Sequence, residues 1–264
     1  MTNHAIPKIS ILTATYRSPD YLHRAIVSVL QQTASDWEMI IAPDDGASYT
    51  HVSAVDPRIR VVSSTQRETG PGQARNRALA QARSKYIAVL DDDDQLAPNF
   101  VNTVLAALRQ TDIVTVPTKY ISEEGKPIRE IGMEKSNIDI THFSQLLGSM
   151  HVIAKRAIYK KWQDCFAQDV LHTCAMIDLA GGHIPIVRAT HYLNTVRQNS
   201  TCTRRKDIDE AYTSVIAQLA VTPLSDHAQQ ATRNLFLYRR QMNKRYETAN
   251  PLGLGYQEFI KSIL

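Results

Sequence analysis

Four consecutive aspartates, Asp91, Asp92, Asp93 and Asp94, follow an apolar segment at residues 86–90. Carboxylates held within a few ångströms of one another repel, so such a run needs either full solvation or a bound cation. Mg²⁺ and Mn²⁺ prefer hard oxygen ligands and would remove this repulsion. Alternate side chains of an extended chain point the same way, so Asp91 and Asp93 can share a face while Asp92 points away. The run predicts a divalent-cation site, and a solvated acidic turn before the next helix is the simpler alternative.

Apolar segments alternate with segments of helical periodicity around these aspartates. Strands are expected at residues 9–14, 38–42, 60–63 and 86–90, and helices at 22–32 and 73–84. This alternation predicts a parallel sheet with helices on both faces. Polar clusters at residues 15–17, 43–46 and 91–94 follow three of the strands, and ligands of such sheets bind outside the carboxyl ends of the strands. Three separate stretches are therefore expected to meet on one rim.

The pattern is less regular from about residue 112. It predicts strands at residues 113–116 and 150–154, a polar loop at 123–132, and helices at 155–162 and 170–179. Beyond residue 203 only helices are expected, at about 207–220, 225–245 and 255–264.

Composition is that of a globular protein, with 43% apolar and 21% charged residues among 264. The net charge of +4 is too small to indicate a nucleic-acid partner. We expect no secretory signal at the N-terminus and no membrane span. The three cysteines form no CxxC pair and the nine histidines form no metal-binding spacing, so each is interpreted as structural. The sparse cysteines favour a cytoplasmic location.

Several sequence blocks occur in a fixed order. They are residues 13–16 (TATY), 30–33 (LQQT), 36–38 (DWE), 44–46 (DDG), 72–76 (GQARN) and 85–94 (KYIAVLDDDD), followed by Pro98. In order and spacing they resemble family 2 glycosyltransferases of the GT-A fold, with the aspartates in the place of the DxD motif. A thinner resemblance continues through residues 168–169, 180–182 and 196–200, and the last 60 or so residues match nothing identified.

The resemblance implies an α/β fold of the GT-A type, with a Rossmann-like, mostly parallel sheet flanked by helices. It implies a catalytic domain at residues 1–203, with a nucleotide-sugar half at 1–110 and an acceptor half at 111–203. Residues 204–264 are then a small helical C-terminal extension.

The resemblance also implies roles for single residues. Donor binding falls to Thr15, Tyr16, Asp44, Asp45, Arg75, Asp91 and Asp92. The metal, Mn²⁺ or Mg²⁺, falls to Asp93, with Asp91 as the second ligand and Asp94 in support. The metal would bridge the diphosphate oxygens and stabilise the leaving nucleoside diphosphate.

A general base is needed to deprotonate the acceptor hydroxyl in an inverting enzyme. Asp169 occupies the position at which the family has an acidic residue for this purpose, and Asp164 is the second candidate for the general base. An N-cap of the following helix is the alternative role for Asp169. Some members of the family have a histidine late in the domain, and the matching position in this sequence is Arg197, with His191 a few residues upstream. The identity of a third metal ligand is therefore left open. Arg17 also departs from the family pattern and adds a cation near the donor.

The resemblance implies a metal-dependent, inverting transfer of a sugar from a nucleotide-diphosphate donor, most often a uridine one, to a glycan or glycolipid acceptor. A bacterial surface-polysaccharide or lipopolysaccharide pathway is the expected setting. Phosphatases with a nucleophilic aspartate carry DxD on the first strand, whereas three strands precede it here. A nucleotidyltransferase would need a glycine- and basic-rich loop after the first strand, which is missing. A non-catalytic nucleotide- or glycan-binding protein on the same fold is the remaining alternative.

The C-terminal segment mixes basic and apolar side chains. Basic residues at 233, 239, 240, 244 and 245 are interleaved with apolar ones. Such a helix can rest on the anionic inner face of the cell membrane near a lipid-linked acceptor, or it can pack on the catalytic domain with its basic face in water. Both interpretations stay open at the level of sequence.

Overall fold

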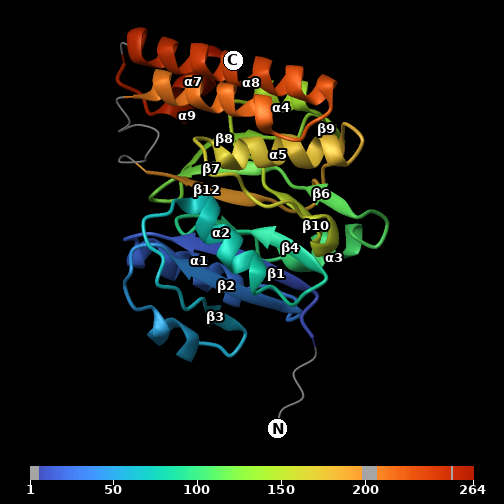
Figure 1. Cartoon of the computed structure of the whole chain (residues 1–264). Coiled ribbons are helices and arrows are strands. Elements are labelled where there is room, and N and C mark those ends of the chain that lie inside the picture. The colour runs from blue at the N-terminus through green and yellow to red at the C-terminus, as the bar shows by residue number, and fades with distance from the viewer. Residues whose placement is uncertain (1–5, 198–206, 251) are drawn as a thin grey trace.

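A computed structural model describes residues 6–197, 207–250 and 252–264 (Figure 1). The strands are β1 (Ile9–Thr15), β2 (Trp37–Pro43), β3 (Ile59–Val61), β4 (Tyr86–Val89), β5 (Gln95–Leu96), β6 (Ile113–Thr115), β7 (Thr118–Ser122), β8 (Pro127–Ile131), β9 (Asn137–Ile138), β10 (Val152–Lys155), β11 (Ile184–Pro185) and β12 (Tyr192–Val196). The α-helices are α1 (Pro19–Leu30), α2 (Pro71–Ala80), α3 (Phe100–Ala107), α4 (Ile140–Leu146), α5 (Gln168–Leu179), α7 (Ile208–Gln218), α8 (Asp226–Thr248) and α9 (Tyr256–Ile263). Short 3₁₀ helices lie at Thr50–Ala54, Arg156–Ile158 and Leu219–Val221.

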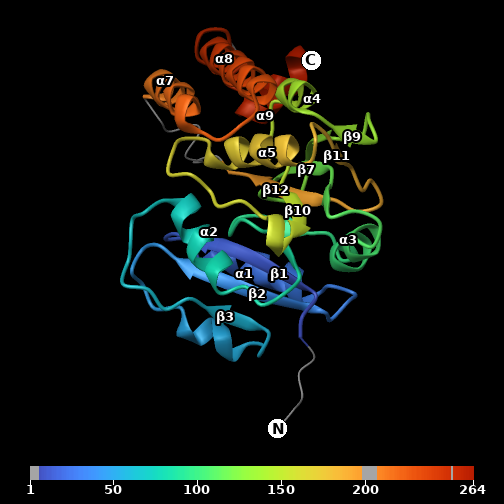
Figure 2. The same cartoon turned by 45° about the vertical axis from the view of Figure 1, so that its right-hand side comes forward.

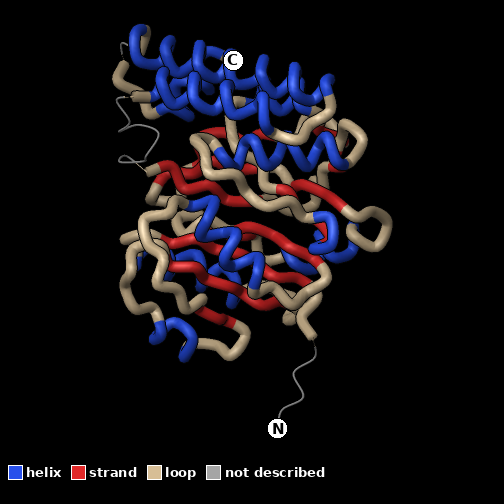
Figure 3. Tube along the Cα trace, viewed as in Figure 1, coloured by secondary structure: helices blue, strands red, loops and turns tan. Residues whose placement is uncertain are grey.

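The main sheet has the strand order β3-β2-β1-β4-β10-β6. Figure 3 shows the strands of the protein in red with helices beside them in blue. β1 runs parallel to β2 and β4, and β2 runs parallel to β3, whereas β10 is antiparallel to β4 and β6. The mostly parallel α/β sheet flanked by helices that was predicted from the sequence is therefore confirmed. Because β1, β2 and β4 share one direction, their carboxyl ends meet at the same edge.

Both faces of this sheet are buried, as the continuous apolar strands predicted. Leu12 and Ile40 pack on one side, in a cluster that includes residues of α2 and α5. Ile11 and Met39 pack on the other, in a cluster that includes residues of α1 and α3. Alternation of side chains along each strand produces this division.

Helix α2 lies close to the segment that precedes α5. A Cβ atom on Gly72 would stand 3.1 Å from the carbonyl oxygen of Gln163 and 3.3 Å from the Cβ of Trp162. The glycine therefore permits the close approach of the two segments. This approach brings Arg75, one turn further along α2, to within 5.9 Å of the centre of the Trp162 ring.

A second, four-stranded sheet has the order β5-β12-β7-β8. Here the prediction of a loop over residues 123–132 was wrong, because β8 forms a hairpin with β7. Pro127 and the charged residues around it hide the apolar alternation, and proline is tolerated because β8 is at the edge of its sheet. The predicted helix at 155–162 was also wrong beyond its first turn, since Tyr159 and Trp162 are buried by packing on His172 and on each other.

The C-terminal helices α7, α8 and α9 lie at the end of the molecule opposite β3, with α5 between them and the main sheet (Figures 1 and 2). Their predicted positions are confirmed within a few residues. Leu235 and Phe236 of α8 are fully buried, and Arg239 is 8% exposed. Leu235 and Phe236 are thus packed inside the protein and are not available to lipid, whereas Leu237 is 41% exposed. In the described part of the chain, no helix has both the length and the apolar character needed to cross a membrane.

Candidate active site

The carboxyl ends of β1, β2 and β4 bring the three predicted polar clusters together. The backbone N–H of Tyr16, after β1, donates to Oδ2 of Asp92, after β4, at 3.3 Å. The backbone N–H of Arg17 donates to Oδ2 of Asp45, after β2, at 2.9 Å. The convergence expected from strand alternation is therefore present in the structure.

The four aspartates point in different directions. Asp91 forms an ion pair with Arg75 of α2 and lies 3.4 Å from Nε2 of His151. Asp92 accepts hydrogen bonds from the backbone of Tyr16 and the hydroxyl of Ser18, so it turns toward the β1–α1 loop. The alternation of side chains along an extended chain predicted that Asp92 points away from the rim. This prediction was wrong, because a turn follows β4 and directs the side chain toward β1.

Asp93 and Asp94 differ in the extent to which their side chains are buried. Asp93 keeps 19% of its side chain exposed and forms an ion pair with Arg197 at 2.8 Å. Asp94 is fully buried and accepts hydrogen bonds from the backbone N–H of Thr195 at 2.8 Å and the side-chain amide of Asn194 at 2.9 Å. Asp94 therefore fixes β12 to the rim and does not face the site.

The electrostatics of the cluster follow from these partners. Burial acts to raise the pKa of Asp91, but the charges of Arg75 and His151 outweigh burial and hold this pKa well below its usual range. Burial and the charge of Asp91 raise the pKa of Asp93 to about 6, and they also raise that of Asp94. Asp93 is therefore a partly exposed carboxylate whose ionised form is disfavoured by its neighbours, which is the condition that a cation relieves.

Asp91 and Asp93 are 27% and 19% exposed and carry the oxygen donors that a divalent metal prefers. No group of three or more His, Cys, Asp or Glu that could hold a metal occurs in the described ranges. Mg²⁺ is commonly held by one or two carboxylates together with substrate phosphates, so two aspartates suffice if the donor supplies the other oxygens. Arg197 and His191 were the residues considered for a third metal ligand. Arg197 forms an ion pair with Asp93. Burial and the charge of Lys119 lower the pKa of His191.

The remaining donor-side candidates differ in exposure. Thr15 is 2% exposed, whereas Tyr16 is 44% exposed and donates its hydroxyl to Glu68. Asp45 accepts hydrogen bonds from the hydroxyl of Tyr49 at 2.7 Å and from two backbone N–H groups. Burial acts to raise the pKa of Asp45, and these hydrogen bonds outweigh it and lower the pKa. Asp45 is therefore held as a carboxylate at the edge of the site.

Asp44 is 4% exposed, and protein groups occupy both of its oxygens. The Thr69 hydroxyl donates at 2.7 Å, the Gly70 N–H at 2.8 Å and Arg77 at 2.7 Å. These bonds tie the end of β2 to the start of α2, the helix that carries Arg75.

Asp169 lies in the first turn of α5, where its Oδ2 accepts a hydrogen bond from the hydroxyl of Ser149 at 3.1 Å. The N-cap of this helix is Ala167, so the capping alternative for Asp169 was wrong. Burial acts to lower the pKa of Arg75, but the negative charges of Asp91 and Asp169 outweigh burial and raise this pKa above its usual range. Asp91 forms an ion pair with this arginine, and the negative charge of Asp169 also acts on it. Asp164 is exposed in the loop that precedes α5.

Sequence reasoning missed two residues of this site. His151 immediately precedes β10 and faces Asp91, and its ring lies 4.9 Å from that of Tyr192. The hydroxyl of Tyr192 accepts the backbone N–H of Asp91 at 2.9 Å. A single histidine and a single tyrosine form no local sequence pattern. They could have been identified only if the pairing of distant strands had been known.

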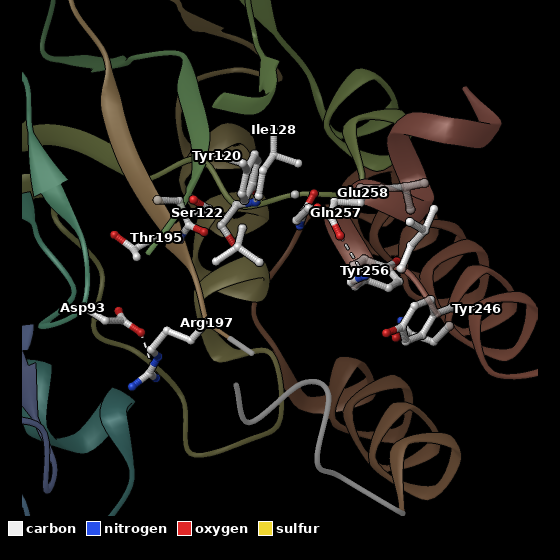
Figure 4. Close-up of a pocket in the computed structure, with 18 of the residues that line it drawn as sticks. Asp93, Tyr120, Ser122, Ile128, Thr195, Arg197, Tyr246, Tyr256, Gln257 and Glu258 are labelled. Carbon is white, nitrogen blue, oxygen red and sulfur yellow. Dashed lines mark hydrogen bonds and ion pairs between the residues drawn. The ribbon is translucent and has the colours of Figure 1, made fainter. Parts of the chain in front are cut away.

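A cavity of about 720 Å³ begins at Asp93 and Arg197 and extends to the C-terminal helices (Figure 4). Tyr120, Ser122 and Glu123 line its β7 side. The side chain of Glu123 accepts a hydrogen bond from the hydroxyl of Tyr21 in α1. Of the late resemblance, Val196 and Arg197 lie at this cavity, and residues 198–200 are outside the described ranges.

Comparison with known proteins places residues 10–165 in the family described as "Glycosyl transferase family 2". The chain is 33% identical over 129 residues to the succinoglycan biosynthesis protein ExoO of Rhizobium meliloti (strain 1021), a match that covers 47% of this chain and 37% of that protein. It is 26% identical over 140 residues to the GalNAc(5)-diNAcBac-PP-undecaprenol beta-1,3-glucosyltransferase of Campylobacter jejuni, which covers 50% and 45%. The chain therefore spans about two fifths of the length of these two relatives.

The fold is similar to that of S. aureus TarS residues 1–349, solved in complex with UDP-GlcNAc. The TM-score is 0.69 at 17% identity, and the match covers 96% of this chain and 77% of the other. At this identity the likeness supports the fold.

Proposed function

This chain belongs to glycosyl transferase family 2, and from that premise we propose that it transfers a sugar from a nucleotide-diphosphate sugar to a glycan or lipid-linked glycan acceptor. The observation that carries the proposal is the arrangement of carboxylates around Arg75. Asp91 binds this arginine from the donor side, and Asp169 acts on it from the acceptor half. An enzyme that joins a donor to an acceptor needs both groups at one place.

On the donor side, we assign the nucleotide to the rim between β1, β2 and β4. Asp45 and the backbone around Thr15 and Tyr16 would hold the base and ribose, with Asp92 fixing the backbone of Tyr16. Asp44 contributes through the loop that it ties to α2, since its oxygens are already occupied.

On the diphosphate side, Asp93 and Asp91 would hold Mn²⁺ or Mg²⁺. When bound, the metal supplies charge stabilisation to the departing diphosphate. Arg75 and Arg197, which pair with these two aspartates, would orient the same carboxylates and balance their charge before the donor enters. Of the two arginines, Arg197 lines the cavity and is the closer candidate for a phosphate contact.

On the acceptor side, Asp169 would accept the proton of the attacking hydroxyl in an inverting transfer. Its carboxylate is oriented by the hydroxyl of Ser149. A base that is already oriented can accept a proton when the acceptor arrives.

We propose a setting in bacterial surface-polysaccharide synthesis. The names of the two relatives support it, since one concerns succinoglycan and the other an undecaprenol-linked glycan. A cytoplasmic place of action, including the inner face of the membrane, is part of this proposal. The free cysteines Cys165 and Cys174 are consistent with a reducing compartment.

The test is donor turnover by the purified full chain with Mn²⁺ and a panel of UDP, GDP and TDP sugars, starting with UDP-GlcNAc. We expect Mn²⁺-dependent release of the nucleoside diphosphate from at least one donor. Asp169→Asn should lower this rate about 10²- to 10⁴-fold while nucleotide binding persists. Asp226→Asn is the matched control, because it removes an exposed carboxylate from the first turn of α8, far from the rim.

Two results would count against the proposal. Tight nucleotide binding without turnover of any donor would favour a non-catalytic binding protein. Equal activity of Asp169→Asn and Asp226→Asn would remove Asp169 as the base and leave Asp164 as the next carboxylate to replace.

A further inference from the structure

The cavity next to Asp93 has two walls from different parts of the chain. One wall consists of β7, β8 and β12, and the other of α7, α8, α9 and the loop at residues 253–255 (Figure 4). Its volume of about 720 Å³ is within the range of sites that enclose small-molecule ligands, roughly 300–1,000 Å³. Residues beyond the part of the chain that matches the family thus form more than half of the lining of a cavity that begins at Asp93.

The C-terminal wall is firmly attached to the catalytic domain. Arg239 of α8 donates a hydrogen bond at 2.6 Å to the carbonyl oxygen of Gly148, and its guanidinium lies 5.1 Å from the centre of the Phe143 ring. Met242, Phe259 and Ile260 bury their side chains with Leu147 in one apolar cluster. The wall is therefore a preformed surface.

This attachment also reaches the predicted base. Gly148, the partner of Arg239, precedes Ser149, whose hydroxyl holds Asp169. Leu147, Gly148 and Ser149 all line the cavity. A molecule in the cavity therefore lies along the loop that positions Asp169, with Asp93 at one end of its path.

Two tyrosines stand at the other end of this path. Tyr246 of α8 and Tyr256 of α9 have ring centres 5.4 Å apart and planes at 84°. The buried Phe259 supports Tyr246 from behind, with ring centres 5.4 Å apart. Both tyrosines are half-buried and line the cavity, opposite Asp93 and Arg197 in Figure 4.

The chemistry of the lining fits a neutral sugar chain. A sugar ring has apolar C–H faces and a polar hydroxyl rim, and tyrosine combines an apolar ring with a polar tip. Polar side chains that can bind hydroxyls line the cavity together with the aromatic ones, and they include Glu123, Asn194 and Gln257. A purely lipid occupant would leave the buried Oε1 of Gln257, which has no hydrogen-bond partner among the described residues, unsatisfied.

We propose that the saccharide acceptor occupies this cavity, and that Tyr246 and Tyr256 of the C-terminal extension bind its sugar units away from the reacting hydroxyl. The proposal rests on the proposed function for the identity of the acceptor. It assigns to residues 207–264 the role of an acceptor-binding wall.

Direct binding tests this without turnover. Cellotetraose, chitotetraose and an α-1,2-linked mannotetraose are titrated into the full chain and followed by saturation-transfer NMR. Tyr246→Ala and Tyr256→Ala should each weaken binding of the best tetrasaccharide about 3- to 10-fold. The two Tyr→Phe variants should retain most of the affinity because they keep the ring.

Tyr238→Ala is the matched control, since Tyr238 is a half-buried tyrosine of α8 that packs on the same apolar cluster without lining the cavity. UDP binding, measured by calorimetry with Mn²⁺, should be unchanged in all these variants. Absence of UDP binding in the wild type would count against the proposed function alone. The acceptor wall would be refuted if no tetrasaccharide binds to the wild type, or if the alanine variants at 246 and 256 bind as tightly as Tyr238→Ala.

Discussion

The Arg75–Asp91 ion pair makes a quantitative prediction about stability. Arg75 has 6% of its side chain exposed, and Asp91 has 27%. Arg75→Met keeps an apolar chain of similar length in place but leaves Asp91 without its main counter-charge. The other cation near Asp91 is His151 at 3.4 Å, and it carries a charge only when protonated. The variant should therefore lose most of the favourable interaction of this carboxylate.

The size of the loss follows from burial. Breaking a buried pair by removing one partner costs roughly 3–5 kcal/mol, and the partial exposure of Asp91 puts the expected loss near the lower value, about 3 kcal/mol. For a chain of this size each kcal/mol shifts Tm by about 2–4 °C, so Arg75→Met should melt roughly 6–12 °C lower. Because the pKa of Asp91 is depressed in the folded state, its stabilisation is fully present above about pH 4, the unfolded value, and is lost as the pH falls through the folded pKa.

A double-mutant cycle at pH 7 isolates the pair. Denaturant unfolding is measured for the wild type, Arg75→Met, Asp91→Asn and the double variant. The double variant should recover part of the stability lost by Arg75→Met, because no unpaired carboxylate is left. Lys8→Met, which opens the exposed Lys8–Asp36 pair, is the control and should change little. A coupling energy below about 0.5 kcal/mol, the usual error of additivity, would refute the account of the pair.

Two further predictions concern acid stability and the metal. Burial lowers the pKa of His172 to about 3, so the unfolded chain takes up a proton below about pH 6.5 and the folded chain does not. The free energy of unfolding should fall by up to about 1.4 kcal/mol per pH unit between pH 6.5 and 3, and by about 2 kcal/mol in total at pH 5. In denaturant titrations His172→Gln should show a flatter dependence of this free energy on pH. Parallel pH profiles of the variant and the wild type would contradict this prediction. Asp93→Asn should weaken Mn²⁺-dependent UDP binding by at least about 10-fold in calorimetry without affecting metal-free UDP binding, and an unchanged Mn²⁺ dependence would remove Asp93 as a ligand.

Local physics was sufficient to predict the fold of the first 90 or so residues. Apolar, β-branched strands such as Ile9–Thr15 and Trp37–Pro43 alternate with helices, and this pattern by itself requires a parallel sheet whose strand ends share an edge. The polar residues that follow those strands, from Tyr16 to Asp93, could therefore be placed on one rim from their positions in the sequence alone. The C-terminal helices were also predicted, because helical periodicity is visible within a few turns.

Tertiary structure decided which partner each side chain has. The four aspartates are chemically identical in the sequence, yet Asp91 binds Arg75, Asp92 faces Tyr16, Asp93 pairs with Arg197 and Asp94 is buried. Arg75 is 16 residues from Asp91, whereas Tyr16 and Arg197 are more than 70 residues from their aspartates, and no local pattern encodes any of these pairs.

The same reason explains what sequence reasoning missed at the acceptor side. His151 reaches Asp91 through the pairing of β10 with β4, and Tyr246 reaches the cavity through the docking of α8 on the loop that carries Ser149. Strand and helix propensities act over neighbouring residues, so the sequence by itself determined the elements and the rim. Contacts between different elements form only when these elements pack, and they determined the division of the aspartates and the wall of the cavity.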